Sequence, residues 1–310
     1  EQCDEEDRFQ PRYEYRRVLG ILLYVARVTR PDLMMVCCYL ARHAADPGRE
    51  HYRLLDRAVW YLYNTRELAL TYSAENDTGL YLKVDAAFQD CPDSQKSTSG
   101  VLLMLAGAAI EWIAKRQSVV ATSTMHSEVI ALDSGMKVLV YALKIVGFIG
   151  LYCPNPIDVY EDNQSAIAFL CSPDFSLKGR VKHLRLKMAW VKETIMDGLV
   201  RLVYTKSEDN TADAMTKLLD RTTMERHRGV FMGHYPDPGR QNATTEMQDI
   251  GRNIEKEVYG ARVSEVVVSV EEVGKCKALC ASIVEEAEIE LSRLVTHEVK
   301  RARVRSLSGR

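Results

Sequence analysis

One stretch near the middle of the chain constrains the fold more than any other. Residues 157–160 are mostly β-branched or aromatic and follow a turn at 155–156, which predicts a short strand. Residues 165–170 are apolar in a pattern that predicts a helix. Asp162 therefore lies where a strand ends and a helix begins, and open α/β sheets place ligands and catalytic groups there. Another interpretation is open from this stretch alone, namely that Asp162 or Asn163 only caps the helix.

The segments on either side predict an α+β domain with α/β character. The periodicity changes from helical to strand-like after Asn76-Asp77, and three strands of an antiparallel meander follow. A helix, the strand that ends at Asp162 with its helix, and then a helix, a strand and a helix complete the order. We therefore expect a mixed five-stranded sheet with flanking helices. The other predicted elements are residues 80–86, 97–105, 109–114, 123–143, 181–196, 199–204 and 211–219.

The length of 310 residues, 46% of them apolar, is enough for two domains, or for one domain with appendages. Three short helical patterns precede the sheet domain and predict a small helical subdomain. The apolar stripe after the sheet domain fits either a coiled-coil-like helix or a solitary, loosely packed one. The expected segments are a disordered acidic N-terminus (1–12), the helical subdomain (13–75), the sheet domain (76–219), a linker rich in Arg, Gly, His and Pro (220–252) and a helical, partly disordered tail (253–310).

The charge and the cysteines limit the function classes. The formal net charge of −2 and the pI of about 6.5 exclude a uniformly basic surface, so any nucleic-acid surface is a local patch. Eight cysteines are scattered without zinc-ligand spacing, and we expect reduced thiols in an intracellular protein. No apolar run is long enough to span a bilayer, and no secretion signal opens the chain. Because the first residue is Glu1, we expect a piece of a longer product.

Four carboxylates occupy comparable places in the predicted elements. Asp85 and Asp162 end two strands, which would bring them side by side if the first and fourth strands are neighbours. Glu128 and Asp213 lie at the starts of helices and would reach in from there. Carboxylates that lie so close together repel one another, and hard divalent cations relieve this repulsion. A set of ligands made only of oxygen atoms favours Mg²⁺ or Mn²⁺. The alternative is four unrelated surface acids among the 43 acidic residues.

A basic segment between Lys178 and Lys206 could form such a local patch for nucleic acid on a chain whose overall charge is mildly negative. We expect its side chains to neutralise duplex phosphates, and the alternative is a solvated helix face. Polar side chains next to Asp162 are expected to contact 2′-hydroxyls, although a helix start also favours such residues. His183 fits either a phosphate contact or a helix cap. The expected nucleic-acid-binding residues are Asn163, Gln164, Ser165, Lys182, His183, Arg185, Lys187 and Lys206.

Several short motifs occur together in one order along the chain. They are residues 22–26, 29–32, 84–86 and 96–100, Ser123-Thr124 ahead of Glu128, residues 161–166, Lys182-His183, and residues 211–213 with Thr216-Lys217. In this order, residues 13–219 resemble the end of the reverse transcriptase and the ribonuclease H domain of copia-type LTR retrotransposon polyproteins. The resemblance implies a ribonuclease H-like fold. It implies that the catalytic and metal-binding acids are Asp85, Glu128, Asp162 and Asp213.

The chain departs from the pattern of this family at four positions. Ala87 stands where the family usually has a second acid, and Phe88 stands where it usually has Trp. His126 replaces a glutamate, and Leu218 replaces a proline. None of these changes removes one of the four acids. No Tyr-x-Asp-Asp sequence of the polymerase type occurs, which excludes DNA synthesis by this chain alone.

The expected function is a metal-dependent endonuclease that cleaves the RNA strand of RNA/DNA hybrids during retrotransposon reverse transcription. Asp85 and Asp162 are expected to bridge two Mg²⁺ ions, or Mn²⁺, with Glu128 on one ion and Asp213 on the other. The expected partners are the hybrid and the remainder of the reverse transcriptase polyprotein, with no membrane, in a cytoplasmic virus-like particle or in the nucleus. Two alternatives are a decayed module that binds nucleic acid or mediates assembly without turnover, and a structural protein whose C-terminal helix drives oligomerisation.

Overall fold

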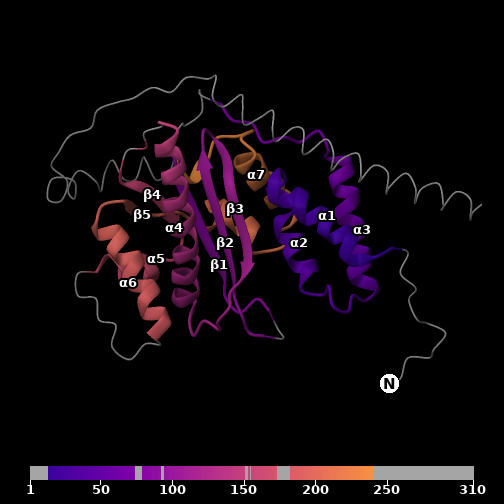
Figure 1. Cartoon of the computed structure of the whole chain (residues 1–310), viewed down its shortest axis with the longest axis horizontal. Coiled ribbons are helices and arrows are strands. Elements are labelled where there is room, and N and C mark those ends of the chain that lie inside the picture. Colours follow the sequence, from indigo (N-terminus) through magenta and orange to yellow (C-terminus); the bar gives the residue numbers. More distant parts are fainter. Residues whose placement is uncertain are drawn as a thin grey trace, which may run out of the picture. The chain divides into compact units, whose positions relative to one another are not determined.

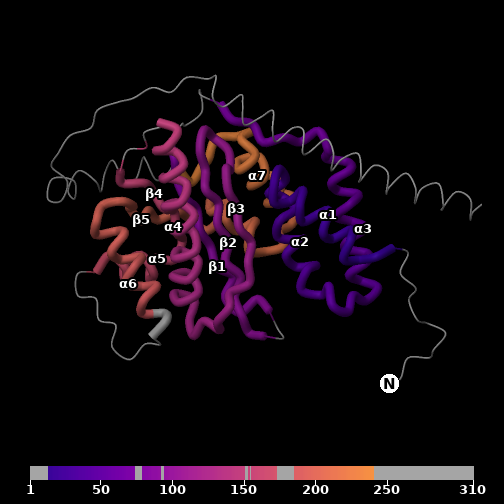
Figure 2. Tube along the Cα trace, viewed as in Figure 1, coloured from indigo at the N-terminus to yellow at the C-terminus, as the bar shows by residue number. Residues whose placement is uncertain are grey.

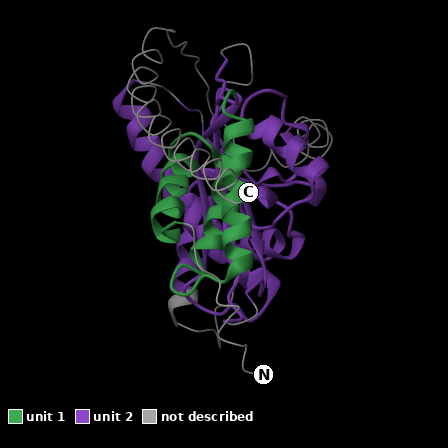
Figure 3. Ribbon diagram, turned by 90° about the vertical axis from the view of Figure 1, so that its right-hand side faces the viewer, with its two compact units in different colours: residues 1–67, 269–310 green, residues 68–268 purple. Residues whose placement is uncertain are grey.

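The structure is a computed structural model that describes residues 13–73, 79–91, 94–150, 153, 155–172 and 182–240, with residues 182–184 described for their backbone alone. The chain divides into two compact units, whose described residues lie within 13–67 and 68–240 (Figure 3). The expected terminal segments 1–12 and 253–310 lie outside the described residues. Among the described helices, none is both long and apolar enough to span a bilayer.

The first unit contains the three predicted short helices. They are α1 (Tyr15–Val28), α2 (Met34–Ala41) and α3 (Arg49–Asn64), with the 3-10 helix η2 (Pro31–Leu33) between the first two. Pro31 fits the first position of η2, because an N–H at that position would have no partner within the helix. The apolar sides of the helices share one core. Its fully buried members include Leu22, Leu33, Cys37, Leu40 and Leu55.

The second unit is built on a mixed sheet of five strands in the order β3-β2-β1-β4-β5. The first three strands form an antiparallel meander, β4 lies parallel to β1, and β5 lies parallel to β4. The predicted mixed sheet is therefore confirmed, and its first and fourth strands are neighbours. The bounds are β1 (Tyr81–Ala87), β2 (Thr98–Leu105), β3 (Ala108–Arg116), β4 (Ile157–Glu161) and β5 (Val200–Tyr204).

Helices cover both faces of this sheet (Figure 1). Helices α4, α5 and α6 pack on one face, while η4 packs on the other face and α7 packs against η4. The bounds are α4 (Thr124–Phe148), α5 (Gln164–Cys171), α6 (Lys182–Met196), η3 (Ser207–Asp209), η4 (Thr211–Met215) and α7 (Arg221–Phe231). Figure 2 follows the chain path, in which the late segment that contains α7 returns to lie beside β3.

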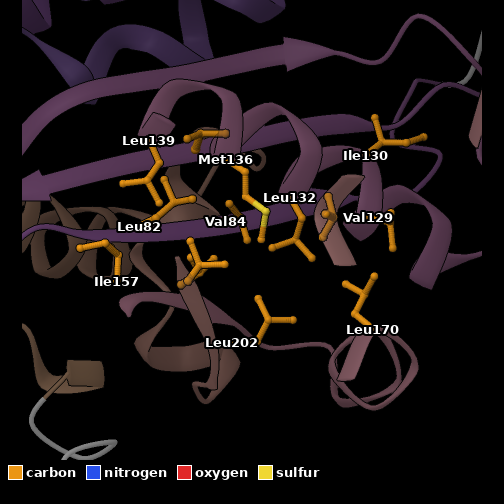
Figure 4. Packing of buried hydrophobic residues seen from close by; sticks show 14 of the residues in the cluster. Leu82, Val84, Val129, Ile130, Leu132, Met136, Leu139, Ile157, Leu170 and Leu202 are labelled. Carbon is orange, nitrogen blue, oxygen red and sulfur yellow. The ribbon is translucent and has the colours of Figure 1, made fainter. Parts of the chain in front are cut away.

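The main core of this unit lies between the sheet and α4 (Figure 4). Side chains alternate along β1, so that Leu82 and Val84 enter this core while Lys83 and Asp85 face the other way. Gly135 lets α4 lie close to the sheet, because a Cβ at this residue would stand 2.8 Å from a methyl of Val84. The α4 side chains that join the core include Val129, Ile130, Leu132, Met136 and Leu139.

The segment after the last strand differs from the expectation. Residues 211–215 form a short 3-10 helix, whereas a helix over residues 211–219 was predicted. Residues 221–231 form α7 where a linker was predicted, and Asp220 caps this helix by accepting from the N–H groups of residues 222 and 223. Phe231 and Met232 are fully buried, which explains why the segment stays against the sheet despite its many charged residues.

The boundary between the units also lies at a different place. The N–H of Thr71 donates to the carbonyl of Met232 at 2.8 Å, and the hydroxyl of Tyr72 donates to the carbonyl of Ala109 at 2.7 Å. These hydrogen bonds join residues 68–73 to the sheet unit. The units therefore divide between residues 67 and 68, whereas the sequence suggested residues 75 and 76.

Candidate metal centre

Three carboxylates from separate elements converge at one edge of the sheet. Asp85 belongs to β1, Asp162 directly follows β4, and Glu128 lies in α4. One oxygen atom of each side chain lies within 4.8 Å of the others. Because β1 and β4 are parallel neighbours, their carboxyl ends meet at the same edge, and this brings the two aspartates together.

The start of α4 determines where Glu128 lies. The hydroxyl of Ser123 caps this helix by accepting from the N–H of His126. The side-chain amide of Gln117, which follows β3, donates to the carbonyl of Ser127 at 2.9 Å. These two contacts fix the first turn of α4 against the sheet, so Glu128 is buried beside the two aspartates.

The fourth predicted acid, Asp213, approaches from the opposite face of the sheet. It lies in η4, outside the group of three, and Lys217 joins it to Asp85. The Lys217 Nζ is 2.8 Å from Asp213 Oδ1 and 3.6 Å from Asp85 Oδ2. The hydroxyl of Thr216 donates to Asp85 as well. Gly100, the register partner of Asp85 on β2, makes this approach possible, because a Cβ there would lie 2.6 Å from Thr216 Cγ2.

Glu161 is a fifth carboxylate, which the sequence interpretation did not select as a site residue. It is fully buried, and its negative charge raises the pKa of Glu128. Its Oε1 accepts from the N–H of Asn163 at 3.0 Å, and its Oε2 has no hydrogen-bond partner. Strand alternation was the available signal, because it places Glu161 on the same face of β4 as the core residue Val159.

Burial and mutual repulsion raise the pKa of these carboxyls. Burial, together with the charge of Asp213, raises the pKa of Asp85 to about 6. Burial and neighbouring carboxylates also raise the pKa of Glu128 and the pKa of Glu161. Burial raises the pKa of Asp162, although the hydroxyl of Ser207 opposes the rise by donating to it at 2.7 Å. Without a bound cation, the carboxyls of Asp85, Glu128, Asp162 and Glu161 therefore take up protons at a higher pH than exposed carboxyls do.

The donor set fits a hard divalent cation. Its atoms are carboxylate oxygens, which Mg²⁺ and Mn²⁺ prefer over nitrogen and sulfur. Two buried oxygens, Glu128 Oε2 and Glu161 Oε2, have no hydrogen-bond partner among the described residues. A cation at this place would relieve the repulsion among the acids and neutralise buried negative charge. Asp85, Glu128 and Asp162 can hold such an ion, and Asp213 lies next to Asp85.

The predicted polar contacts next to Asp162 divide into two kinds. The side-chain oxygen of Asn163 accepts from the N–H of Ala166 at 3.0 Å, so Asn163 is the cap of α5. Asp162 is not the cap, and its carboxylate joins the acidic cluster. Gln164 and Ser165 are exposed at the start of the same helix. These two side chains are therefore accessible to a ligand.

The predicted basic patch contains one lysine that is paired within the fold and two cations that are exposed. Lys187 forms an ion pair with Asp133, a buried carboxylate of α4, and so joins α6 to α4. Arg185 and Lys206 are exposed. The side chains of residues 182–183, Lys and His, lie outside the described part of the chain. Part of the basic charge therefore stabilises the fold, and part of it faces solvent.

This architecture defines a ribonuclease H-like domain: a mixed sheet of this strand order, with acids where its two central parallel strands and the helix after the meander meet. The retrovirus-related Pol polyprotein from transposon TNT 1-94 of Nicotiana tabacum is 29% identical over 221 residues, and that from transposon RE2 of Arabidopsis thaliana is 28% identical over 212 residues. The chain is similar to the Pol polyproteins of copia-type retrotransposons, and this similarity fits the ribonuclease H region of such a polyprotein. The alignments cover 71% and 68% of this chain but 16% and 14% of the two polyproteins.

Other comparisons extend this picture. The secreted RxLR effector protein 161 of Plasmopara viticola is 32% identical over 127 residues, which are 41% of this chain and 89% of that protein. No family model matches the chain. Among solved structures, a ribonuclease H1 isolated from compost, LC11, is 15% identical, with a TM-score of 0.35 over 48% of this chain and 98% of that chain. The polyprotein relatives and the fold support a nuclease role of the ribonuclease H type.

Proposed function

We propose that the sheet unit is a divalent-cation-dependent endonuclease that cleaves the RNA strand of RNA/DNA hybrids. The observation that carries the proposal is the convergence of Asp85, Glu128 and Asp162, with one oxygen of each within 4.8 Å of the others. Similarity to the transposon Pol polyproteins supports the hybrid as the substrate. The proposed partner is the remainder of the polyprotein, in the cytoplasm or the nucleus.

The chain's own residues would position the cations and keep their ligands in place. The ligands would be Asp85, Glu128, Asp162 and Asp213. When bound, two Mg²⁺ or Mn²⁺ ions stabilise negative charge on the attacking and leaving oxygens of a phosphodiester. The hydroxyl of Thr216 donates to Asp85 and the hydroxyl of Ser207 donates to Asp162, and both contacts restrict the orientation of a ligand.

The exposed groups beside the cluster would hold the hybrid. Since Asn163 caps α5, we assign the contacts with 2′-hydroxyls to the exposed pair Gln164-Ser165. We assign phosphate contacts to the exposed cations Arg185 and Lys206. Lys187 is paired with a buried carboxylate, so we assign it to the fold.

The substitution Asp162→Asn tests this function with a fluorogenic RNA/DNA hybrid. The unmodified chain should cleave the hybrid with Mg²⁺ and should not cleave it with EDTA. Because a neutral amide replaces a charged ligand, we expect the variant to lose at least about a hundredfold in cleavage rate. Circular dichroism should show that the variant keeps its fold.

Asp158→Asn is the matched control, because Asp158 lies on the same strand and pairs with Arg201 at 2.7 Å, outside the cluster. This variant should cleave at the rate of the unmodified chain. Mg²⁺-dependent cleavage that survives in the Asp162→Asn variant would overturn the assignment. An unmodified chain that binds the hybrid without turnover would favour the non-catalytic nucleic-acid-binding module.

A further inference from the structure

Lys217 places one positive charge inside the acidic cluster. Its Nζ is 2.8 Å from Asp213 Oδ1 and 3.6 Å from Asp85 Oδ2. The same charge opposes the rise of the pKa of Glu128 and of the pKa of Asp162. A single ammonium group therefore acts on all four proposed ligands.

The local structure keeps Lys217 at this place and keeps it charged. The N–H of Lys217 donates to the carbonyl of Asp213 at 2.9 Å, so both side chains leave the same turn of the chain. Burial alone would lower the pKa of Lys217, but Asp85, Asp213 and Asp162 outweigh burial and raise it above its ordinary value. The side chain is 42% exposed, which gives the ammonium group a path into solvent.

We propose that Lys217 is a built-in counter-cation: its ammonium neutralises the acids of the metal-free chain, and a divalent cation binds by displacing it toward solvent. The inference rests on the proposed function, because it takes the four acids as cation ligands. The ammonium contacts Asp213 Oδ1 and Asp85 Oδ2, so it would compete with a cation for these two carboxylates. Lys217 is thus a residue that sets the affinity for the cation, and it takes no part in the chemistry.

Because Lys217 competes with the cation, its removal should raise the affinity for the divalent cation. Removal of one unit charge about 5 Å from a divalent ion, in a half-exposed site, should tighten cation binding on the order of tenfold. A purely structural role predicts the opposite sign, because a loosened η4 would carry Asp213 away from Asp85 and weaken binding.

The substitution Lys217→Gln tests the proposal by titration calorimetry of Mn²⁺ into the chelator-treated full chain, without nucleic acid. We expect binding roughly tenfold tighter than in the unmodified chain, and a lower melting temperature for the metal-free variant, since its acids lose their counter-charge. Lys217→Arg keeps the charge and should keep the affinity of the unmodified chain.

Lys137→Gln is the matched control. Lys137 forms an ion pair with Asp133 four residues before it, at 2.8 Å, in the same spacing and distance as Lys217 with Asp213. Asp133 lies outside the acidic cluster, so this control should leave the affinity for Mn²⁺ unchanged.

The outcomes separate the inference from the function on which it rests. Equal or weaker binding by the Lys217→Gln variant, or an equal gain in the Lys137→Gln control, overturns the counter-cation role while the metal site stands. An unmodified chain that binds no Mn²⁺ at millimolar concentration overturns the proposed function, and the inference falls with it.

Discussion

Glu161 is fully buried where β4 meets α5, and one of its two oxygens has no hydrogen-bond partner. An ionised carboxylate in such a place loses its hydration without full compensation. Burial, together with the charges of Asp162 and Asp85, raises the pKa of Glu161 well above its ordinary value. In the metal-free chain, this side chain is therefore a source of instability at neutral and alkaline pH.

We expect Glu161→Gln to raise the free energy of unfolding of the chelated chain at pH 8 by about 1 kcal/mol or more, since one pKa unit corresponds to about 1.4 kcal/mol. The folded-state pKa lies above the ordinary 4.5, so the stability that Glu161 contributes is present below pH 4.5 and is lost as the pH rises through the folded-state pKa. The gain from glutamine should therefore shrink toward zero in acid. Urea denaturation in EDTA between pH 4 and pH 8 measures it.

Glu193→Gln serves as the control, because Glu193 is exposed on α6. Its effect on the free energy of unfolding should stay within about 0.5 kcal/mol at every pH. A gain for Glu161→Gln that is equally large at pH 4 and pH 8 would contradict the role of ionisation.

The convergence of three acids could be predicted from the sequence, because periodicity locates strand ends and helix starts, and Asp85, Glu128 and Asp162 stand at them. Strand ends alone do not select Glu161; the alternation along β4, which places it on the same face as the core residue Val159, was the further signal. The role of Lys217 was also hidden, because its ion pair with Asp85 joins residues that are distant in the chain.

At the scale of elements, the position of η4 decides whether Asp213 reaches the cluster. This short helix lies across β2 at Gly100, opposite Asp85 in the strand register. A Cβ on residue 100 would lie 2.6 Å from Thr216 Cγ2 and 2.8 Å from the carbonyl oxygen of Ala212. Both distances are shorter than van der Waals contact, so a side chain at this residue must displace η4.

We expect Gly100→Ala to lower the free energy of unfolding by about 1–3 kcal/mol through overpacking. It should also weaken Mn²⁺ binding, because a displaced η4 carries Asp213 away from Asp85. Urea denaturation and titration calorimetry measure the two effects.

Gly20→Ala is the control: a Cβ at Gly20 of α1 meets nothing within 4 Å, so this variant should be neutral or up to about 1 kcal/mol more stable. An unchanged Mn²⁺ affinity in the Gly100→Ala variant would remove η4 from the metal site.

The mixed five-stranded sheet could be predicted, since each strand has a clear period, whereas the neighbourhood of the first and fourth strands was only a condition of the sequence argument. The helix α7 was not predicted, because the Arg, Gly, His and Pro content of residues 220–240 resembles that of a linker. The cap at Asp220 and the apolar run Val230-Phe231-Met232 were the signals that favoured a packed helix.

At the scale of the whole sheet unit, a buried ion pair joins the segment after α7 to the central strand. Lys83 of β1 is fully buried, and its Nζ donates to Asp237 Oδ1 at 2.7 Å and to the carbonyl of Asp209 at 2.9 Å. The hydroxyl of Tyr81 donates to Asp237 Oδ2 at 3.0 Å. These contacts connect β1, the end of η3 and the residues after α7.

We expect Asp237→Ala to lower the free energy of unfolding by about 3–5 kcal/mol, because it leaves the buried ammonium of Lys83 without its counter-charge. The double variant Lys83→Met with Asp237→Leu replaces both charges by apolar groups and should lie within about 1 kcal/mol of the unmodified chain. Urea denaturation compares the variants. Equal losses in the single and the double variant would mean that the ion pair itself, and not the uncompensated charge, accounts for the stability.

Asp237 lies downstream of Thr216-Lys217, the last of the family motifs, so the folded unit extends past that motif. A cut before Asp237 would remove the counter-charge of the buried ammonium of Lys83, so a stable fragment of this unit has to extend at least through Asp237.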